Sequence, residues 1–445
     1  MWAVLAALAV ALAGLVLAGD RVGARVLRSF PPQGGALSAY GRVGVEFAQA
    51  MQAESVAAHF TVEPAVGGAW HWVGHTAWFA PNQALVPGTT YTARLAPGAA
   101  STNGRVTRAE VAWTFTVREP RLGYLAPASG GPTEVWRAAA NAPGAAAVTA
   151  TGGRVFDFAL SPDGEQIVLS VVNTEGGIDL WLQPGGGMGE TGRMLVNCGF
   201  DRCSAPAWSP TSAQLAYSRE EQGLSPNAPH GPPRVWLANP DTGATSALFQ
   251  DSQVLGYGPT WSPDGQRLAF FDGSVNGIRV LDLPTGATYV LPTFTGLVGA
   301  FAPDSATLLF TDLTIQNNET RSHLYAADLR TGAVNERSGP PGSDYGPPAW
   351  SPDGQWIAIG VRAESGGPGR QLWLMRPDGS EAHALLQDPA YTYGRYQWDP
   401  YSQRLAVQRL PLGTPFPKSE VVVVDIAGAS EQLIAVDATL PTWWP

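Results

Sequence analysis

The sequence predicts an all-β protein, and two observations support this. The chain contains 52 glycines and 38 prolines among 445 residues but only 14% charged residues, which is typical of many short strands joined by turns. The stretch that begins Trp261-Ser-Pro-Asp-Gly continues into the alternating run Arg267-Leu-Ala-Phe. Pro263 presets φ for a turn and Gly265 supplies a positive φ, so this stretch predicts a β-hairpin with a bulge.

Variants of this hairpin signature recur 40 to 53 residues apart. That period is typical of β-propeller blades and differs from the patterning of helical repeats. We therefore expect each repeat to form one four-stranded blade. The first-strand markers are Leu160, Trp208, Trp261, Phe301, Trp350, Trp398 and Trp443.

Composition narrows the class of protein further. An apolar content of 44% is enough to bury a core, and the net charge is −10. A nucleic-acid-binding protein would normally carry a basic stripe or a basic domain, and none is visible. We therefore expect no nucleic-acid partner.

The chain begins with an apolar run over residues 2–19, so residues 1–19 are predicted to be a signal anchor or a signal peptide. Either would place the following domains outside the cytoplasm, at the periplasm or cell surface, or in the medium if the segment is cleaved. Arg21, Arg25 and Arg28 follow the run, which leaves open an orientation with the rest of the chain in the cytosol. The predicted membrane contact is this segment.

Residues 20–118 carry short alternating runs separated by Pro and Gly turns, which predicts an Ig-like β-sandwich. This segment resembles the bacterial Ig-like domain of the SbsA type. The stretches that carry the resemblance are Ser29-Phe-Pro-Pro-Gln-Gly, Val45-Glu-Phe-Ala-Gln-Ala-Met and Leu85-Val-Pro-Gly-Thr-Thr-Tyr-Thr. Within the segment, His71 and His75 should lie on one strand face about 13 Å apart, too far to share a metal ion.

Residues 119–445 are predicted to form the propeller. The first repeat lacks a first strand, whereas the segment Leu440–Pro445 carries a first-strand motif with nothing after it. A propeller ring closes by pairing its first and last elements, so we expect the C-terminal strand to complete the first blade and give seven blades.

A second marker, an aromatic or branched residue in the third strand, keeps the same period. Together with the Trp-Ser-Pro-Asp-Gly turns, it makes residues 120–445 resemble the repeats of the TolB-like β-propeller. That resemblance implies the fold and no particular activity. The third-strand markers are Trp136, Trp181, Trp236, Val280, Tyr325, Trp373 and Val423.

No catalytic or cofactor motif is present, so we expect no catalytic residue, no cofactor and no metal. The chain has no Gly-x-Ser-x-Gly elbow, no His-Glu-x-x-His pair and no Gly-rich phosphate loop after a strand. The repeated turn acids Asp163, Asp264 and Asp353 are expected to cap their own backbone. Cys198 and Cys203 are too few for a zinc site and predict a local disulfide in an oxidising compartment.

The long connections from second to third strands, and from fourth strands to the next blade, open on the face opposite the Ser-Pro-Asp-Gly turns. Tyr257, Tyr345 and Tyr393 come four or five residues before a first-strand tryptophan, with Arg395 beside the last of them. Tyrosine and arginine are enriched in binding hot spots, so these four residues are predicted to form a ligand-binding mouth. The alternative is that the rings pack between blades.

The sequence thus favours a non-catalytic cell-envelope binding or scaffold protein. Its propeller face would recognise a protein, peptide or glycan, and its Ig-like domain would serve as a spacer from the membrane. One alternative is a propeller enzyme of glycosidase or lyase type with its active site at the channel mouth. Another is a structural subunit of an envelope assembly.

Overall fold

The computed structural model describes residues 23–445 apart from 132, 141–143, 188–191, 212, 226–227, 317–318, 338, 340–343 and 364–366. The chain divides into two compact units, the first ending at Glu119 and the second spanning Pro120–Trp444. The predicted apolar run 2–19 lies outside the described residues. Within the part that is described, we find no helix long and apolar enough to cross a membrane.

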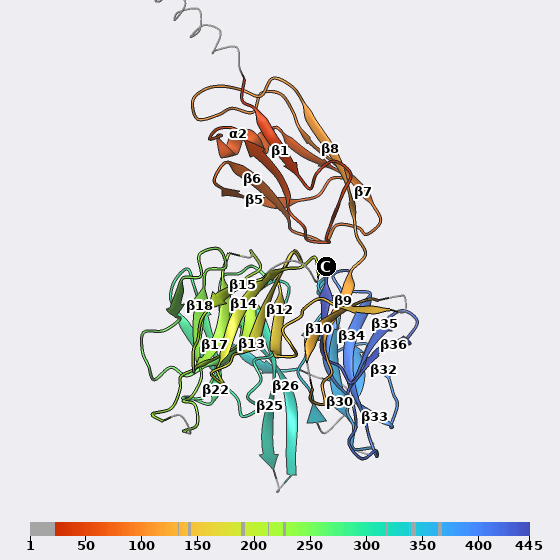
Figure 1. Cartoon of the computed structure of the whole chain (residues 1–445). Coiled ribbons are helices and arrows are strands. Elements are labelled where there is room, and N and C mark those ends of the chain that lie inside the picture. The colour runs from red at the N-terminus through yellow and green to blue at the C-terminus, as the bar shows by residue number, and fades with distance from the viewer. Residues whose placement is uncertain are drawn as a thin grey trace, which may run out of the picture. The chain divides into compact units, whose positions relative to one another are not determined.

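The first unit is a β-sandwich of two four-stranded sheets, as predicted (Figure 1). One sheet has the order β1-β3-β6-β5 and the other β2-β8-β7-β4, with β2 and β8 parallel. One short helix precedes β4. The elements are β1 Val26–Phe30, β2 Gly35–Leu37, β3 Val43–Phe47, α2 Ala53–Ala58, β4 Phe60–Glu63, β5 Gly68–Val73, β6 Thr76–Pro81, β7 Thr90–Leu95 and β8 Val111–Val117.

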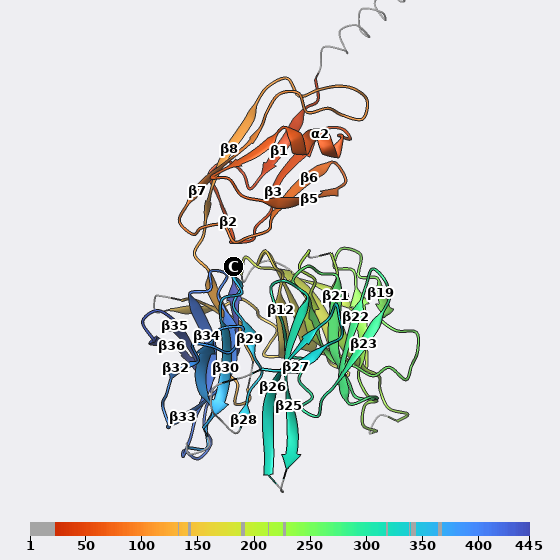
Figure 2. The same cartoon turned by 180° about the vertical axis from the view of Figure 1, so that it is seen from behind.

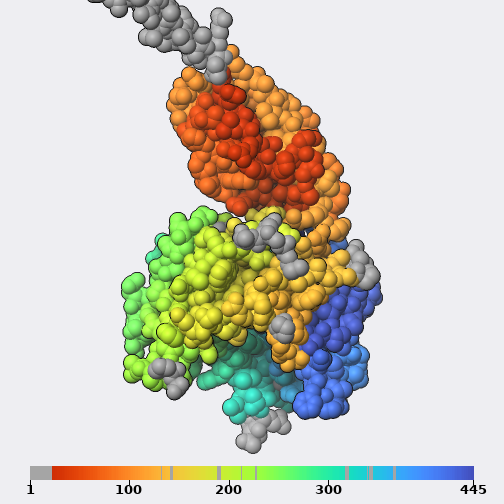
Figure 3. All heavy atoms as spheres, viewed as in Figure 1, coloured from red at the N-terminus to blue at the C-terminus, as the bar shows by residue number. Residues whose placement is uncertain are grey.

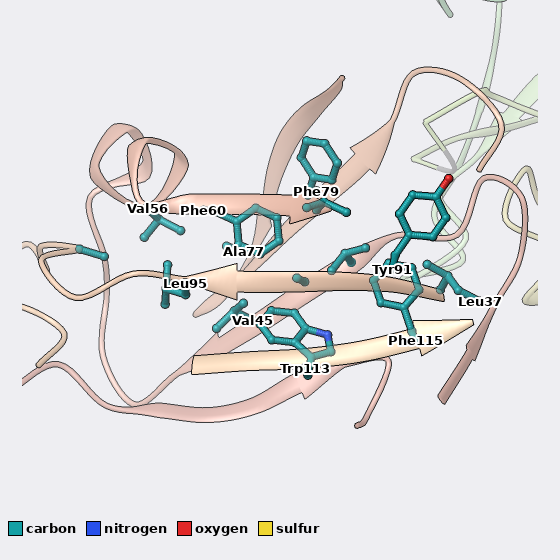
Figure 4. Packing of buried hydrophobic residues seen from close by; sticks show 14 of the residues in the cluster. Leu37, Val45, Val56, Phe60, Ala77, Phe79, Tyr91, Leu95, Trp113 and Phe115 are labelled. Carbon is teal, nitrogen blue, oxygen red and sulfur yellow. The ribbon is translucent and has the colours of Figure 1, made fainter. Parts of the chain in front are cut away.

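Aromatic side chains from both sheets fill the core of the sandwich (Figure 4). Tyr91 and Phe115 stack with ring centroids 5.7 Å apart, and the Tyr91 hydroxyl accepts a hydrogen bond from the backbone N–H of Val86. The expectation that His71 and His75 share a strand face is wrong. His75 lies in the turn between β5 and β6, because Gly74, at φ +58°, begins that turn within the predicted strand.

The second unit consists of antiparallel blades, numbered here in chain order from the blade that contains β9. Figures 1 and 2 show them side by side around the unit. From inner to outer strand, blade 1 is β37 Thr439–Trp444, β9 Arg121–Ala126, β10 Glu134–Ala139 and β11 Ala145–Ala147. Blade 2 is β12 Val155–Leu160, β13 Gln166–Val172, β14 Ile178–Pro184 and β15 Arg193–Val196. Blade 3 is β16 Arg202–Trp208, β17 Leu215–Glu220, β18 Arg234–Ala238 and β19 Thr245–Ala247.

The remaining blades repeat this order, and in blade 6 two short strands take the place of one inner strand. Blade 4 is β20 Tyr257–Trp261, β21 Arg267–Asp272, β22 Gly277–Asp282 and β23 Thr288–Pro292. Blade 5 is β24 Ala300–Phe301, β25 Thr307–Gln316, β26 Glu319–Asp328 and β27 Val334–Glu336. Blade 6 is β28 Asp344–Tyr345 with β29 Ala349–Trp350, then β30 Ile357–Arg362, β31 Gln371–Met375 and β32 His383–Leu386. Blade 7 is β33 Tyr391–Trp398, β34 Arg404–Pro411, β35 Glu420–Asp425 and β36 Ser430–Val436.

The Ser-Pro-Asp-Gly turns cap their own backbone. In blade 4 Asp264 Oδ1 accepts the backbone N–H of Gln266 and the Ser262 hydroxyl, and Gly265 adopts φ +69°. Where blade 5 has serine in place of this glycine, Ser305 still adopts φ +59°, and its hydroxyl accepts a hydrogen bond from the backbone N–H of Asp264. The serine therefore offsets an unfavourable φ by tying two neighbouring turns together.

First-strand tryptophans bond neighbouring blades to each other. The indole Nε1 of Trp261 donates to the carbonyl of Ala207, that of Trp398 to Ala349, and that of Trp208 to Ala159, at 3.0 to 3.2 Å. Each bond joins the inner strand of one blade to the inner strand of the preceding blade. Tryptophan recurs at this position because an apolar ring fills the space between blades while its N–H reaches a backbone acceptor.

The C-terminal strand completes the first blade, as the sequence predicted. β37 pairs with β9 in antiparallel register, with Trp443 opposite Leu122 and Trp444 opposite Arg121. Trp443 Nε1 donates to the carbonyl of Gln397 in blade 7. The strand thus joins the first and last blades. This strand order supports the prediction of a seven-bladed ring.

Candidate functional site

The two ends of the blades differ in which connections they carry. The turns from first to second strands lie at one end. The turns from second to third strands and the connections from fourth strands to the next blade lie at the other, which we call the loop face. Figures 1 and 2 show the β25–β26 hairpin extending from the loop face, away from the end at which β37 finishes, and Figure 3 shows it standing out from the propeller surface.

Exposed large apolar side chains of the propeller gather on the loop face. Among the described residues, none occurs in the first-to-second or third-to-fourth turns, and the others lie on outer strands. Isolated exposed apolar residues are ordinary, but a concentration on one face of a rigid scaffold is typical of an interaction surface. Those on the loop face are Phe156, Val172, Phe200, Leu224, Tyr257, Val275, Phe294, Leu297, Ile315 and Phe416.

A hollow of about 570 Å³ opens on this face between blades 2 and 3. Phe200, which is 57% exposed, lines it together with Arg202, Glu220 and His230. The carbonyl of Phe200 lies 2.9 Å from His230 Nε2, so the long second-to-third connection of blade 3 is held against the loop that carries Phe200. The hollow therefore presents an exposed phenylalanine among charged groups of both signs.

A disulfide joins Cys198 and Cys203, and both residues are buried. It closes the loop that presents Phe200. Within that loop, Asp201 forms a 2.6 Å ion pair with Arg219 of β17, and its other carboxylate oxygen accepts the backbone N–H of Gln222. The loop is thus fixed covalently and by charged hydrogen bonds, which restrain the backbone that carries Phe200.

The structure separates the four residues predicted to form a mouth. Tyr257 begins β20, is 41% exposed and donates its hydroxyl to the carbonyl of Gly296. Tyr345 is partly buried in β28, and Arg395 is exposed in β33. Tyr393 is 1% exposed. The placement of Tyr393 at a mouth is therefore wrong, and the packing alternative holds for this residue.

Register explains the difference between the tyrosines. Tyr257 precedes its tryptophan by four residues, whereas Tyr345 and Tyr393 precede theirs by five. The partners on the second strand show the same difference. In blade 4, the partner of Tyr257 comes three residues after the partner of Trp261. In blade 7, the partner of Tyr393 comes four residues after the partner of Trp398. Successive side chains alternate faces, so this one-residue difference sends the rings to opposite sides of their sheets.

Tyr393 belongs to an internal network in blade 7. Arg409, itself buried, donates to Glu420 at 2.7 Å and to Glu431, and its guanidinium lies 3.9 Å from the ring centroid of Tyr391. Burial, reinforced by the charge of Glu431, raises the pKa of Tyr393 to about 12. This tyrosine therefore stays protonated and serves packing.

Sequence analysis missed Asp157, on the inner strand of blade 2. Its Oδ1 accepts the backbone N–H of Phe158 at 2.7 Å, and it sits where the register of β12 shifts. Burial raises its pKa to about 6, while the backbone N–H groups of Phe158 and Ala205 and the charge of Arg395 oppose the rise. Arg395 lies at the corresponding shift in blade 7, and blade 1 lies between the two blades in strand order.

Neither Asp157 nor Phe200 carried a sequence signal strong enough to predict a site. An aspartate three residues before a first-strand marker could have been noticed, because the corresponding residue in blade 7 is Arg395. In the described ranges, no group of three or more His, Cys, Asp or Glu residues is placed to hold a metal ion.

Comparison with known proteins supports both folds. Residues 20–117 match the bacterial Ig-like domain family. A curated relative, dipeptidyl-peptidase 5 of Porphyromonas gingivalis, is 29% identical over 147 residues, which cover 29% of this chain. The match spans only about a fifth of that relative's length, 20%.

Among solved structures, a puromycin hydrolase matches with a TM-score of 0.52 and 18% identity, covering 72% of this chain and 52% of its own. TolB from Acinetobacter baumannii matches with a TM-score of 0.44 and 14% identity, covering 96% of this chain and all of its own. At these identities the likeness concerns the fold alone. Residues 20–117 thus match a bacterial Ig-like domain, and the chain shares its fold with solved structures such as the puromycin hydrolase.

Proposed function

We propose that the propeller is a non-catalytic binding module that docks a partner protein or peptide on its loop face. The observation that carries this proposal is the concentration of exposed large apolar side chains on that face, against none in the turns at the opposite end of the described blades. Apolar and aromatic side chains supply most of the affinity of protein interfaces, whereas a glycan surface would call for more polar contacts.

The loop that holds Phe200 is the centre of this proposed interface. Its disulfide and the Asp201–Arg219 ion pair restrict it before a partner arrives. A loop whose backbone is ordered before binding loses less conformational entropy, so more of the energy of burying Phe200 appears as affinity. The hollow of about 570 Å³ beside Phe200 offers room for a side chain of the partner.

We assign this activity to the cell envelope, with the Ig-like domain as a spacer. A disulfide persists in oxidising compartments, and the apolar run 2–19 is suited to a membrane anchor or an export signal.

Chemical crosslinking and affinity capture from envelope extracts of the native host test the proposal, with residues 25–445 as bait. The variant Phe200→Asp with Phe416→Asp alters the loop face. The matched control, Val334→Asp with Leu433→Asp, alters exposed apolar residues on the outer strands β27 and β36. We expect one partner to be captured by the parent and the control and lost with the loop-face variant. Equal capture by both variants would refute the proposal.

Asp157 favours a second candidate, an enzyme with its active site at the channel. A carboxyl group that titrates near pH 6 opposite Arg395 is suited to general acid or base work. A panel of oligosaccharide and polyuronate substrates tests this candidate. Turnover that is lost in Asp157→Asn, with a pH profile that bends near 6, would favour the enzyme over the binding module.

A further inference from the structure

Among the described residues of the propeller, one buried carboxylate, that of Asp179, lines a cavity and has no ion pair. Four aspartates of the described residues are buried, Asp163, Asp179, Asp272 and Asp399. Asp272 pairs with Arg279 at 2.7 Å, Asp399 pairs with Arg404 at 3.2 Å, and Asp163 is held within a turn. Asp179 on β14 is 4% exposed, and it accepts a hydrogen bond from the backbone N–H of Cys198 through Oδ1 alone.

Asp179 lines a cavity of about 480 Å³ between blades 1 and 2, a size that suits a small organic ligand. Its walls are mixed: the Trp181 ring and Met194 lie beside the buried side chains Leu169 and Val171, and polar groups such as Gln183 complete the lining. From blade 1 and the connection after it, Val148, Ala150 and Thr151 line the cavity, and these short side chains leave space beside Trp181.

The charged and aromatic groups that line this cavity favour a positively charged ligand. A carboxylate that forms no ion pair attracts a cation, and an ammonium group would give Asp179 a partner. An indole ring nearby attracts the same cation through its π face, and the aliphatic wall accommodates an apolar body. Arg154 lines the cavity from an exposed position, where its Nε donates to the carbonyl of Thr151.

We propose that the cavity between blades 1 and 2 binds a small primary amine with an aromatic or branched aliphatic body, its ammonium group paired with Asp179. The cavity reaches the loop face, where Val172 lines it, but neither Phe200 nor Asp157 does, so amine binding can be tested apart from docking at Phe200.

Asp179 also has a structural role, which any test must separate from ligand binding. It fastens the connection at Cys198, as other residues at this point of the third strand fasten theirs. An asparagine keeps a carbonyl oxygen for the Cys198 N–H, removes the negative charge and replaces the other oxygen with an NH2 group. If the Asp179 carboxylate is present to bind a ligand and destabilises the ligand-free fold, Asp179→Asn should raise the melting temperature of the ligand-free protein. A purely structural carboxylate would give no such rise.

Isothermal titration calorimetry with 2-phenylethylamine as the probe tests the proposal, with 2-phenylethanol and 3-phenylpropanoate as neutral and anionic analogues. We expect the amine to bind, both analogues to bind at least about tenfold more weakly, and Asp179→Asn to weaken amine binding by at least about tenfold. The matched control is Asp251→Asn. That aspartate is exposed and likewise accepts one backbone N–H, from Gln253, so amine binding should not change.

Amine binding that survives Asp179→Asn, or equal binding of the amine and the alcohol, would overturn the proposal, as would no amine binding to the parent. If Asp179→Asn does not fold, Ala150→Trp makes the decision, because it fills the cavity from an exposed position and leaves Asp179 in place. Loss of amine binding in Ala150→Trp supports the site, and retention rejects it.

Discussion

At the scale of single residues, Asp157 gives the propeller a defined pH response. Its pKa is raised from 3.8 in the unfolded chain to about 6 in the folded protein. A raised carboxyl pKa means that the folded state binds the proton more tightly. Its contribution to stability is fully present below about pH 4 and is lost as pH rises through 6.

The variant Asp157→Asn should remove this response. We expect its free energy of unfolding to exceed that of the parent by about 1–2 kcal/mol at pH 7.5, less than the full shift would give because the side chain is partly exposed. The excess should shrink toward pH 3, below the unfolded pKa of 3.8, where the parent carboxyl is mostly protonated in both states. Urea titrations at the two pH values measure the difference, and a pH-independent difference would contradict the assignment.

The tyrosines show where sequence reasoning stopped at the residue scale. The repeat identified the first strands correctly, so Tyr257, Tyr345 and Tyr393 do lie at their beginnings or just before them. Which face each ring occupies depends on a one-residue register difference and on bulges, and neither is visible in the spacing of the tryptophans. Exposure of Phe200 likewise depends on a loop whose shape no local pattern specifies.

At the scale of elements, one position in the third strand fastens the outgoing connection of its blade. In blade 1, Glu134 Oε1 accepts the backbone N–H groups of Thr151 and Gly153 at 2.7 and 2.8 Å. In blade 6, the side chain of Gln371 contacts the backbone at both Asp388 and Tyr391. The residue type varies because the connection offers donors in one blade and both donors and acceptors in another. A repeat search therefore does not detect this position.

Glu134→Ala should destabilise the propeller by about 2–3 kcal/mol, since two backbone N–H groups lose a charged acceptor. Glu134→Gln keeps one acceptor oxygen and should cost about half as much. Chemical denaturation measures both variants. Glu381→Ala is the control, because its ion pair with Arg376 is exposed and should contribute little. If Glu134→Ala lowers the free energy of unfolding no more than the control does, the hydrogen bonds from Glu134 to Thr151 and Gly153 do not stabilise the propeller.

Elements that depend on local chemistry were the ones predicted well. The Ser-Pro-Asp-Gly hairpins form as expected because proline, aspartate and glycine each specify part of a turn. The alternating runs of residues 20–118 form the sandwich for the same reason. The interblade bonds of Trp261 and Trp398 were not predicted, since they depend on the distance between blades rather than on sequence within one blade.

At the scale of the whole molecule, the disulfide indicates whether the protein resides in an oxidising or a reducing compartment. The bridge between Cys198 and Cys203 closes a loop with a sequence separation of 5, for which loop closure predicts about 2 kcal/mol of stabilisation. We expect mass spectrometry of non-reduced protein from its native host to find no alkylatable thiol. Two alkylated cysteines would instead place the propeller in a reducing compartment.

The ring-closing strand makes the strongest prediction for the whole molecule. Six residues at a frayed chain end usually contribute little, but here Trp443 and Trp444 are buried, and their indole groups donate to Gln397 in blade 7 and Gly164 in blade 2. Deleting 440–445 removes two large buried side chains, each worth about 3 kcal/mol or more, and exposes the edge of β9.

We therefore expect the truncated protein to melt at least about 10 °C below the parent or to fail to fold. A synthetic peptide of residues 437–445 added in trans should recover part of the loss, because it can pair with β9 in the register of β37, whereas a scrambled peptide should not. Differential scanning fluorimetry measures both effects. A truncated protein that melts within a degree or two of the parent would mean that the ring does not depend on β37, and the seven-bladed closure would then be wrong.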